Sequence, residues 1–307
     1  MDESDLAFLV LAHTDAVLLD RLLNALPPGS TKIVHIDRKS TDLAMFAPTA
    51  PNTRLVHNRV PVFWAGFSVV EATLSLIRLG LTATHAQRFI LLSGQSYPLR
   101  SNLSIVEFFD RHREREFIGY FNIEQADQHY INKLETYFIS EEIISGMLKI
   151  KHSRTVKIAS RVSSFLAQRF RRKWRKQLRG LHPAFGSQWW ALTRPCLKTI
   201  LEISETQPEF QFFKLSFAPD EMYFHTMVAN SRFHERAGGF QQFQGRGNWR
   251  LNELHLLNSK GSLHKTYSLD DWKEIAAADK LFLRKLSSGG SEELIQKIEA
   301  ELRKDEV

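Results

Sequence analysis

The chain has little cysteine and no long apolar run. Cys196 is the single cysteine among 307 residues, so no disulfide can form within the chain, which fits a reducing compartment. No stretch approaches the roughly 18 apolar residues that a membrane-spanning helix needs. The acidic residues 1–5 lack the basic start and the cleavage site of a signal peptide. We therefore expect a cytoplasmic protein.

The motifs of several common enzyme classes are also missing. The sequence has no Walker P-loop, no GxGxxG after the first apolar run and no HExxH. It has no cluster of cysteine and histidine that would hold a metal ion. The function therefore has to be inferred from several segments together.

The overall composition is that of a globular protein with a buried core. Hydrophobic residues make up 43% of the chain and charged residues 24%, which is ordinary for a folded domain. The 22 Phe and 6 Trp residues serve packing or the stacking of sugar rings, and composition does not separate these uses. The length suits one large domain or two small ones.

The net charge of +7 is concentrated in one segment. Residues 154–179 contain many Lys and Arg and no acid. Such a surplus suits a phosphate-rich partner, a nucleic acid or an anionic membrane face. The alternative is a solvated helix whose basic face has no partner.

The first 120 residues alternate between apolar runs and helical patterns. Residues 6–12 (LAFLVLA) form a continuous apolar run, as expected of a strand that is buried on both faces. This alternation predicts an α/β fold with an open, mostly parallel sheet, whose ligand site lies outside the carboxyl ends of the strands. The pattern predicts strands at residues 6–12, 32–36, 54–57, 88–92 and 116–120, and helices at 17–26, 68–81 (with Ser68 as its N-cap) and 103–112.

The second half of the chain has a weaker pattern. We interpret residues 123–180 as a helical, basic insertion over the sheet, because no Gly/Pro/Ser-rich linker flanks it. The single domain then divides into a nucleotide-binding half (6–122), this insertion, an acceptor and catalytic half (181–290) and a C-terminal helix (291–307). The pattern predicts strands at residues 188–192 and 250–257, helices at 154–179, 195–204, 219–229 and 291–304, and a loop at 238–247.

Polar residues follow three of the predicted strands. His13 follows the first, Asp37 ends the second, and Ser93 opens a loop to Ser96 after the strand at 88–92. An acid at a strand's carboxyl end can accept hydrogen bonds from ribose or uracil. The alternative for Asp37 is that it caps the next turn.

Two tryptophan motifs are candidate binding segments. Trp64 precedes Gly66 and the start of a predicted helix, whose free N–H groups carry partial positive charge; the alternative is a tight turn with a buried indole. Trp189 and Trp190 are adjacent and would point to opposite faces of a strand. We expect one of them to line a site, because burying both fully is costly.

Acids and cations in the second half offer catalytic groups. Asp220 and Glu221 follow Pro219 at a predicted helix start, where the helix dipole favours acids, yet a carboxylate there can also serve as a general base. Arg250 and Lys285, with Arg246 and Arg284 nearby, could neutralise a leaving diphosphate without a metal. The alternative for each cation is an ordinary surface position on a basic protein.

Six segments in order resemble one enzyme family. FLVLAHTD, HIDRKS, VFWAGFSVVEATLSLI, FILLSGQSYPLRS, GSQWWALTR and APDEMYFHT are similar to the core-2/I-branching N-acetylglucosaminyltransferase family in its bacterial form, including the peptide xylosyltransferase branch. The resemblance covers most of residues 6–285. It implies a GT-A-type fold, with a Rossmann-like sheet flanked by helices, and an inverting transfer from a UDP-sugar without a metal.

The resemblance also implies roles for individual residues. Glu221 would be the general base, and Asp37 would contact the uridine. Arg250 and Lys285 would hold the diphosphate, and Trp189 or Trp190 would shape the sugar pocket. The family loop usually reads SGQDYP, so Ser96 replaces an acid that would bind a sugar hydroxyl. The remaining residues predicted to bind donor or acceptor are His13, Lys39, Trp64, Ser93, Gln95, Ser96, Ser187 and Asp220.

These observations favour a metal-independent UDP-sugar transferase. Its donor sugar would be N-acetylglucosamine, xylose or glucose, and its acceptor a hydroxyl of a glycan, a lipid-linked glycan or a peptide. Residues 154–179 would make peripheral contact with an anionic membrane. Two alternatives remain, namely a nucleic-acid-binding protein that uses this basic segment, which we favour less, and a degenerate transferase that binds a sugar nucleotide without turnover.

Overall fold

A computed structural model describes residues 1–307 apart from 42, 150–153, 248–250, 261–262 and 305–307. Its central element is a five-stranded sheet of strand order β3-β2-β1-β4-β8. Neighbouring strands are parallel except at the β4–β8 pair. The predicted α/β fold, with a mostly parallel GT-A-type sheet flanked by helices, is confirmed. The strands are β1 (Leu6–Ala12), β2 (Thr31–Ile36), β3 (Thr53–Leu55), β4 (Arg88–Ser93) and β8 (Ala191–Thr193).

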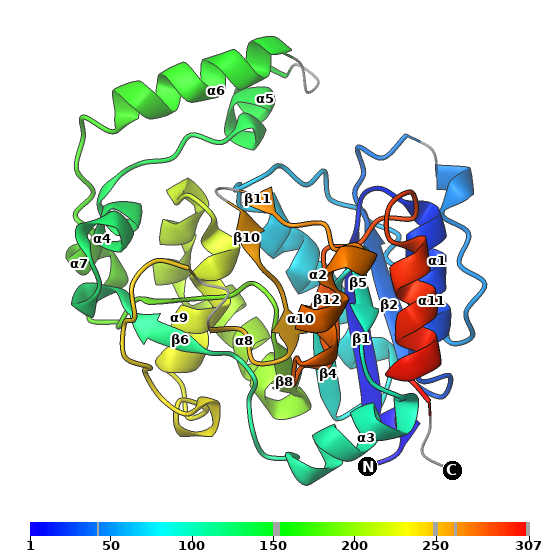
Figure 1. The fold of residues 1–307 in the computed structure, drawn as a ribbon. Coiled ribbons are helices and arrows are strands. Elements are labelled where there is room, and N and C mark those ends of the chain that lie inside the picture. The colour runs from blue at the N-terminus through cyan, green and yellow to red at the C-terminus, as the bar shows by residue number, and fades with distance from the viewer. Residues whose placement is uncertain (42, 150–153, 248–250, 261–262, 305–307) are drawn as a thin grey trace.

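Helices cover both faces of this sheet (Figure 1). In β1, Ala7 and Leu9 pack into one core with α2 and α8, whereas Phe8 and Val10 pack into another with α1 and α3. Successive side chains of a strand point to opposite faces, so burial on both faces explains the unbroken apolar run. The helices are α1 (Ala16–Ala25), α2 (Ser68–Ala83), α3 (Asn102–Arg111), α8 (Arg194–Thr206) and α9 (Tyr223–Ala229).

A three-stranded sheet brings the C-terminal part of the chain to the main sheet. It consists of β5 (Ser96–Pro98), β12 (Phe282–Arg284) and β9 (His255–Leu256), with Arg284 opposite Ser96. α10 (Trp272–Ala276) precedes β12, and α11 (Glu292–Glu301) follows it and lies beside α1, where Arg21 pairs with Glu292 at 2.6 Å. Two-stranded sheets are formed by β6 (Tyr120–Asn122) with β7 (Ala184–Gly186) and by β10 (Ser259–Lys260) with β11 (Leu263–His264).

The described residues between β6 and β7 form four α-helices. They are α4 (Gln128–Glu135), α5 (Glu141–Leu148), α6 (Arg154–Ala167) and α7 (Trp174–Leu178). α5 and α6 stand away from the sheet at the top of Figure 1. The division of the domain into four parts stays a prediction.

Three predicted strands differ from the structure. Residues 188–190 have no regular structure, so the strand begins at Ala191. The segment 116–120 contributes a single bridge at Phe117 and then the first residue of β6. In the described residues 251–257 the strand is limited to β9. A Cβ on Gly186 would lie 2.2 Å from the Gly119 carbonyl oxygen, so the two segments approach each other closely where β6 pairs with β7.

Three predicted helix features are also wrong. Residues 219–229 are a 3-10 turn (Pro219–Glu221) followed by α9, with Met222 in a non-helical conformation between them. The basic segment 154–179 is two helices, α6 and α7, because Arg172 between them is buried against Phe212 and donates to its carbonyl. Ser68 is not an N-cap; its hydroxyl accepts a hydrogen bond from the Phe63 N–H at 2.9 Å. The tertiary contacts outweigh the local pattern in each case.

Candidate active site

The carboxyl ends of β1 and β2 place His13 and Asp37 next to each other. The Asp37 N–H donates to the Ala12 carbonyl at 2.8 Å. Its buried carboxylate accepts from the Lys39 N–H at 2.8 Å and the Val62 N–H at 3.0 Å. Asp37 therefore does cap the following turn, as the alternative interpretation proposed. It also fixes the segment that leads to Trp64, and its contact with a uridine stays a prediction.

Positive charges gather around His13. Desolvation lowers the pKa of the exposed His13 imidazole, and Lys285, Arg284 and Lys39 lower it further, against the opposing effect of Asp37. The Lys39 ammonium lies 3.3 Å from the Asp37 carboxylate and also donates to the Val62 carbonyl. Three cations therefore lie around the ends of the first two strands. Lys39 comes from the N-terminal half of the sequence, and Arg284 and Lys285 come from the C-terminal half.

The loop after β4 holds the Lys285 segment in place. The Ser96 hydroxyl accepts from the Ser93 N–H at 3.3 Å, and the Ser93 hydroxyl accepts from the Gln95 N–H at 3.1 Å. The Gln95 carbonyl accepts from the Leu286 N–H at 3.0 Å. Ser96 is fully buried, so the residue that replaces the family's acid bonds to its own turn. These side chains position the loop.

Arg284 forms a buried cationic centre beside this loop. Its guanidinium lies over the Trp189 ring, 4.7 Å from the centroid. Burial lowers its pKa to about 10, and its Nε and Nη1 atoms are buried without a hydrogen-bond partner in the described residues. His255, whose ring lies 6.0 Å from Trp189, likewise has two unpartnered ring nitrogens. A buried cation with unsatisfied donors is costly, which suits a position that an anionic ligand completes.

The adjacent tryptophans do not share a strand. Trp189 and Trp190 are both buried, at 6% and 0% exposure, and the Trp189 ring lies against the Arg284 guanidinium. The expectation that one of them lines a site stays a prediction. Ser187 is buried and accepts a hydrogen bond from the Asn252 amide at 2.9 Å. Arg250 lies outside the described residues.

Two carboxylates occupy a turn on the other side of the site. Asp220 and Glu221 follow Ala218, whose backbone is left-handed with φ +51° and whose N–H donates to the Ala65 carbonyl at 3.1 Å. Burial raises the pKa of Asp220 to about 6, and the positive charge of Lys133 opposes that rise. Burial also lowers the pKa of Lys133, and Glu221 and Asp220 both oppose that shift. One ammonium group of α4 therefore interacts with both carboxylates.

Lys133 is a residue that the sequence did not single out. Its ammonium lies 4.6 Å from the centre of the Phe217 ring and 5.2 Å from that of Phe185. A lone Lys in a weakly patterned segment carries no signal of its own. Only the tertiary structure brings the Lys133 ammonium near Asp220 and Glu221.

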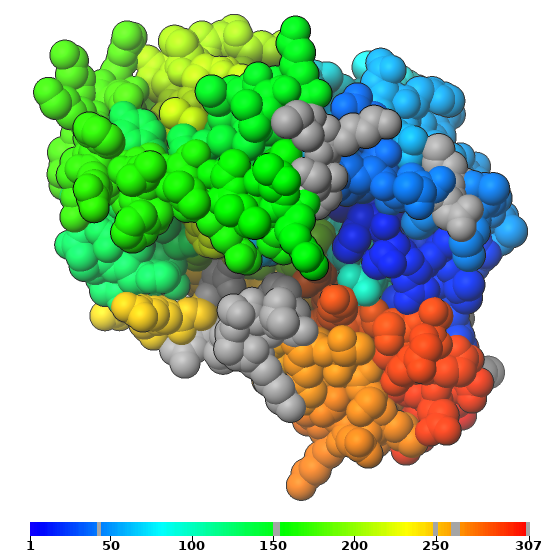
Figure 2. All heavy atoms as spheres, turned by 90° about the horizontal axis from the view of Figure 1, so that it is seen from above, coloured from blue at the N-terminus to red at the C-terminus, as the bar shows by residue number. Residues whose placement is uncertain are grey.

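The Trp64 segment joins the two sides of the site. Trp64 is 80% exposed, and its ring meets that of Phe217 edge to face at 5.5 Å. Two residues before it, Val62 bonds to Asp37 and Lys39; one residue after it, Ala65 bonds to Ala218. The cations and the carboxylates therefore lie at the two ends of one short segment. Seen from above, the surface is hollowed between the green insertion and the orange C-terminal part (Figure 2).

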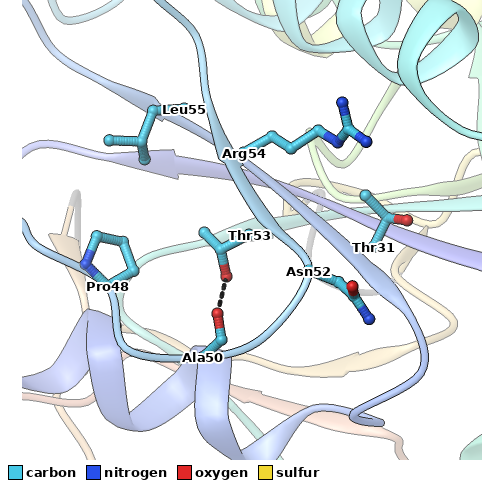
Figure 3. Close-up of a pocket in the computed structure, with 7 residues that line it drawn as sticks. All are labelled: Thr31, Pro48, Ala50, Asn52, Thr53, Arg54 and Leu55. Carbon is cyan, nitrogen blue, oxygen red and sulfur yellow. Dashed lines mark hydrogen bonds between the residues drawn. The ribbon is translucent and has the colours of Figure 1, made fainter.

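The described part of the chain contains a cavity next to the Trp64 segment and a larger one away from it. One of about 340 Å³ runs between α6 and the rings of Trp64, Phe138 and Phe217, beside the Asp220 turn. The larger, of about 550 Å³, lies at the starts of β2 and β3, near Thr31 and Asn52 (Figure 3). None of the predicted site residues lines the larger cavity, which lies at the opposite edge of the sheet from the strand ends.

Ion pairs neutralise three of the cations in the basic segment. Arg171, Arg175 and Arg179 pair with Glu135, Glu124 and Glu209 at 2.7, 3.6 and 3.2 Å. Among the described residues, Lys157 and Arg161 of α6 form no ion pair. No helix in the described residues is both long and apolar enough to cross a membrane, and no three or more His, Cys, Asp or Glu side chains there form a group able to hold a metal ion.

Several known proteins align with most of this chain at low sequence identity. Rat xylosyltransferase 1 is 24% identical over 236 residues, which cover 74% of this chain and 26% of the relative. Dog xylosyltransferase 1 is 25% identical over 238 residues (74% and 22%), and human xylosyltransferase 2 is 23% identical over 236 residues (74% and 24%). The chain spans about a quarter of the length of these relatives. The profile of one family, described as core-2/I-branching enzyme, matches residues 6–238. Because this match covers the sheet and the turn with Asp220 and Glu221, the chain belongs to the core-2/I-branching enzyme family.

Proposed function

We propose that this glycosyltransferase moves a sugar from a UDP-sugar to an acceptor hydroxyl, with inversion and without a metal ion. One observation carries the proposal: Asp220 and Glu221 lie at one end of the Trp64 segment, and the cations around His13 lie at the other. Inversion requires a base on the acceptor side and positive charge at the leaving group. The segregation of acids and cations supports this division of roles.

On the acceptor side, Glu221 takes the proton of the acceptor hydroxyl. The hydroxyl oxygen then forms the bond to the anomeric carbon, while the bond from that carbon to the diphosphate oxygen breaks and its electron pair leaves with UDP. Asp220 is the second candidate for the base, because a carboxyl whose pKa is raised to about 6 holds a proton more strongly near neutral pH. The positive charge of Lys133 opposes the rise in the pKa of Asp220.

On the donor side, the proposal assigns the diphosphate to Lys285 and Arg284. Lys285 is the residue that the family resemblance suggested. Arg284 extends the assignment, since its buried guanidinium has unpartnered donors. Arg250, the other suggested ligand, lies outside the described residues and stays a prediction. Asp37 is proposed to contact the uridine, and positive side chains take the role that a metal ion has in other transferases.

The donor sugar is proposed to be N-acetylglucosamine, xylose or glucose. The relatives named above carry the name xylosyltransferase, which supports xylose as the first donor to test. The acceptor hydroxyl belongs to a glycan, a lipid-linked glycan or a peptide.

Peripheral contact with an anionic membrane is also part of the proposal. In α6 the exposed side chains include the apolar Ile158, Val162 and Leu166, at 56, 52 and 50% exposure, together with Lys157 and Arg161. A helix with apolar and basic faces suits a lipid surface. Nucleic acid would be contacted by the cations alone, so the exposed apolar side chains disfavour that alternative.

Sedimentation with vesicles tests the membrane contact. The vesicles would contain phosphatidylglycerol and phosphatidylcholine, and Leu166→Glu should reduce binding. Leu103→Glu on α3, at 55% exposure, is the matched control and should leave binding unchanged. Equal binding by both variants would remove this part of the proposal.

Calorimetric titration tests the donor site. UDP, UDP-N-acetylglucosamine, UDP-xylose and UDP-glucose would each be titrated with and without EDTA. Saturable binding of UDP that does not change with EDTA is expected, and the tightest sugar nucleotide names the donor. Loss of binding in EDTA would overturn metal independence, and no binding to any of the four would overturn the transferase proposal. Binding without product formation would favour the degenerate transferase.

A further inference from the structure

Helix α6 differs from an ordinary surface helix in which of its faces is buried. Its buried face carries Ser160 and Ser164, which bond to the backbone of Ile139 at distances of 2.6 to 3.1 Å. Val156 is also buried on that face, but Ile158, Val162 and Leu166 face outwards, recur every four residues and are at least half exposed. A surface helix normally turns its apolar stripe to the core. The apolar stripe of α6 is therefore left exposed in the described structure.

The cations of α6 lie between these two faces and on one side only. Successive residues of a helix are about 100° apart, so Lys157 and Arg161 lie between the docked serines and the apolar row. The opposite flank carries Thr155, Ala159 and Ser163, none of which is charged. Around the helix, the buried serines are thus followed by the cations and then by the exposed apolar row.

The charged flank lines the smaller cavity. Lys157 and Arg161 form its α6 wall with Phe165, and the rings of Trp64 and Phe217 form the facing wall. Glu141 of α5 also lines the cavity, so the wall is not purely basic. Phe217 directly precedes the turn that carries Asp220 and Glu221. The cavity therefore lies between α6 and the Phe217 residue that leads into the turn with the proposed general base.

We propose that the acceptor is an anionic glycolipid, in which a negatively charged group joins a sugar to a lipid chain. The sugar stacks on Trp64 with its hydroxyl towards Glu221, as aromatic faces suit sugar rings. The charged group lies between Lys157 and Arg161, and the lipid chain follows the outer row of Ile158, Val162 and Leu166. The order sugar, anion and chain matches the order of surfaces from the Asp220 turn to the outside of α6. This inference rests on the proposed function, and it narrows the acceptor from three classes to one.

Three probes separate the parts of this proposal. Decyl glucosyl phosphate carries sugar, anion and chain; decyl glucoside lacks the anion; glucose 1-phosphate lacks the chain. Each would be titrated into the full chain with UDP present, below its micelle concentration. Decyl glucosyl phosphate is expected to bind at least about tenfold more tightly than either of the others. Equal binding of all three would overturn the proposal.

Variants then assign the groups. Lys157→Ala combined with Arg161→Ala should remove the preference for the anion, whereas Leu166→Glu should remove the preference for the chain. Arg111→Ala combined with Lys198→Ala removes the same charge at exposed sites on α3 and α8, and Leu103→Glu matches the second change; both controls should keep both preferences. A free uronic acid or an acidic peptide that bound as tightly as decyl glucosyl phosphate would also overturn the proposal. UDP is also titrated into each protein. If the unmodified chain does not bind UDP, the proposed function itself fails. If it binds UDP but shows no preference for decyl glucosyl phosphate, only the acceptor proposal fails.

Discussion

The two sides of the site are built by different means. The donor side consists of residues at the ends of buried strands, such as His13 and Asp37, held by backbone hydrogen bonds between neighbouring strands. The acceptor side consists of a 3-10 turn, an exposed indole and helices of the insertion. A side anchored on a sheet has little freedom to vary, whereas loops and helices over it can change without disturbing the core. Under the proposed roles, donor recognition is fixed by the fold, and acceptor recognition by the segments laid over it.

Replacing the proposed base should give the largest effect on the acceptor side. Glu221→Gln removes the proton acceptor but keeps the size of the side chain. We expect turnover to fall by about 10²- to 10⁴-fold, since general base catalysis contributes that much, with UDP affinity unchanged. Steady-state kinetics and calorimetry together measure this. If Asp220→Asn shows the larger loss and Glu221→Gln keeps turnover, the base is Asp220.

The corresponding change on the donor side should weaken UDP itself. Lys285→Ala removes one charged hydrogen-bond donor, so we expect UDP to bind roughly 10- to 100-fold more weakly. Calorimetry with UDP measures the change, and Lys198→Ala on α8 serves as the control. Unchanged affinity in Lys285→Ala would place the diphosphate elsewhere, and the same titration of Arg284→Met would show whether the buried guanidinium is the main ligand.

A pH profile probes the electrostatics of the acceptor side alone. Lys133 lowers the pKa of Asp220 against the effect of burial. Removing that charge with Lys133→Met should raise the pKa of Asp220 further. The acidic limb of the turnover profile should then move to higher pH, by about one unit. Lys198→Met should leave the limb in place, and a limb that does not move in Lys133→Met would show that Asp220 does not control turnover.

The smallest expected effect is at the exposed indole. Trp64→Ala removes a stacking surface from the acceptor side, so the acceptor KM should rise roughly two- to tenfold while UDP affinity remains the same. Phe170→Ala, at a residue that is 70% exposed in the insertion, is the control. A change in UDP affinity instead would show that the Trp64 segment serves the donor side, and the contrast between the two sides would no longer hold.

The strand positions show how far local sequence patterns reach. The strand at residues 6–12 was predicted to the residue because burial on both faces gives an uninterrupted apolar run. The strand at 188–192 was placed too early, because Trp189 and Trp190 have high strand propensity but are buried by contacts with Arg284 and Phe224. Hydrophobicity indicates that such residues are buried, and it does not indicate in which backbone conformation.

The basic segment shows a second kind of limit. Its lack of acids is plain in the sequence, but the acids that pair with Arg171 and Arg175 come from Glu135 and Glu124, 36 and 51 positions away. Arg172, which looks like its neighbours, is buried at 4% exposure and supports the fold. The structure therefore neutralises some cations of the basic segment with distant acids and buries one, whereas Lys157 and Arg161 of α6 form no ion pair among the described residues.

Apolar periodicity and ordered motifs were enough to predict the α/β fold, the family and the carboxyl-end positions of His13 and Asp37. The tertiary structure alone decided which side chains meet across distant segments. It placed Lys133 within the field of Asp220 and Glu221, stacked Arg284 on Trp189 and turned the apolar row of α6 outwards. The physical reason is that charge and burial act through space, over distances of a few ångströms that sequence separation does not report.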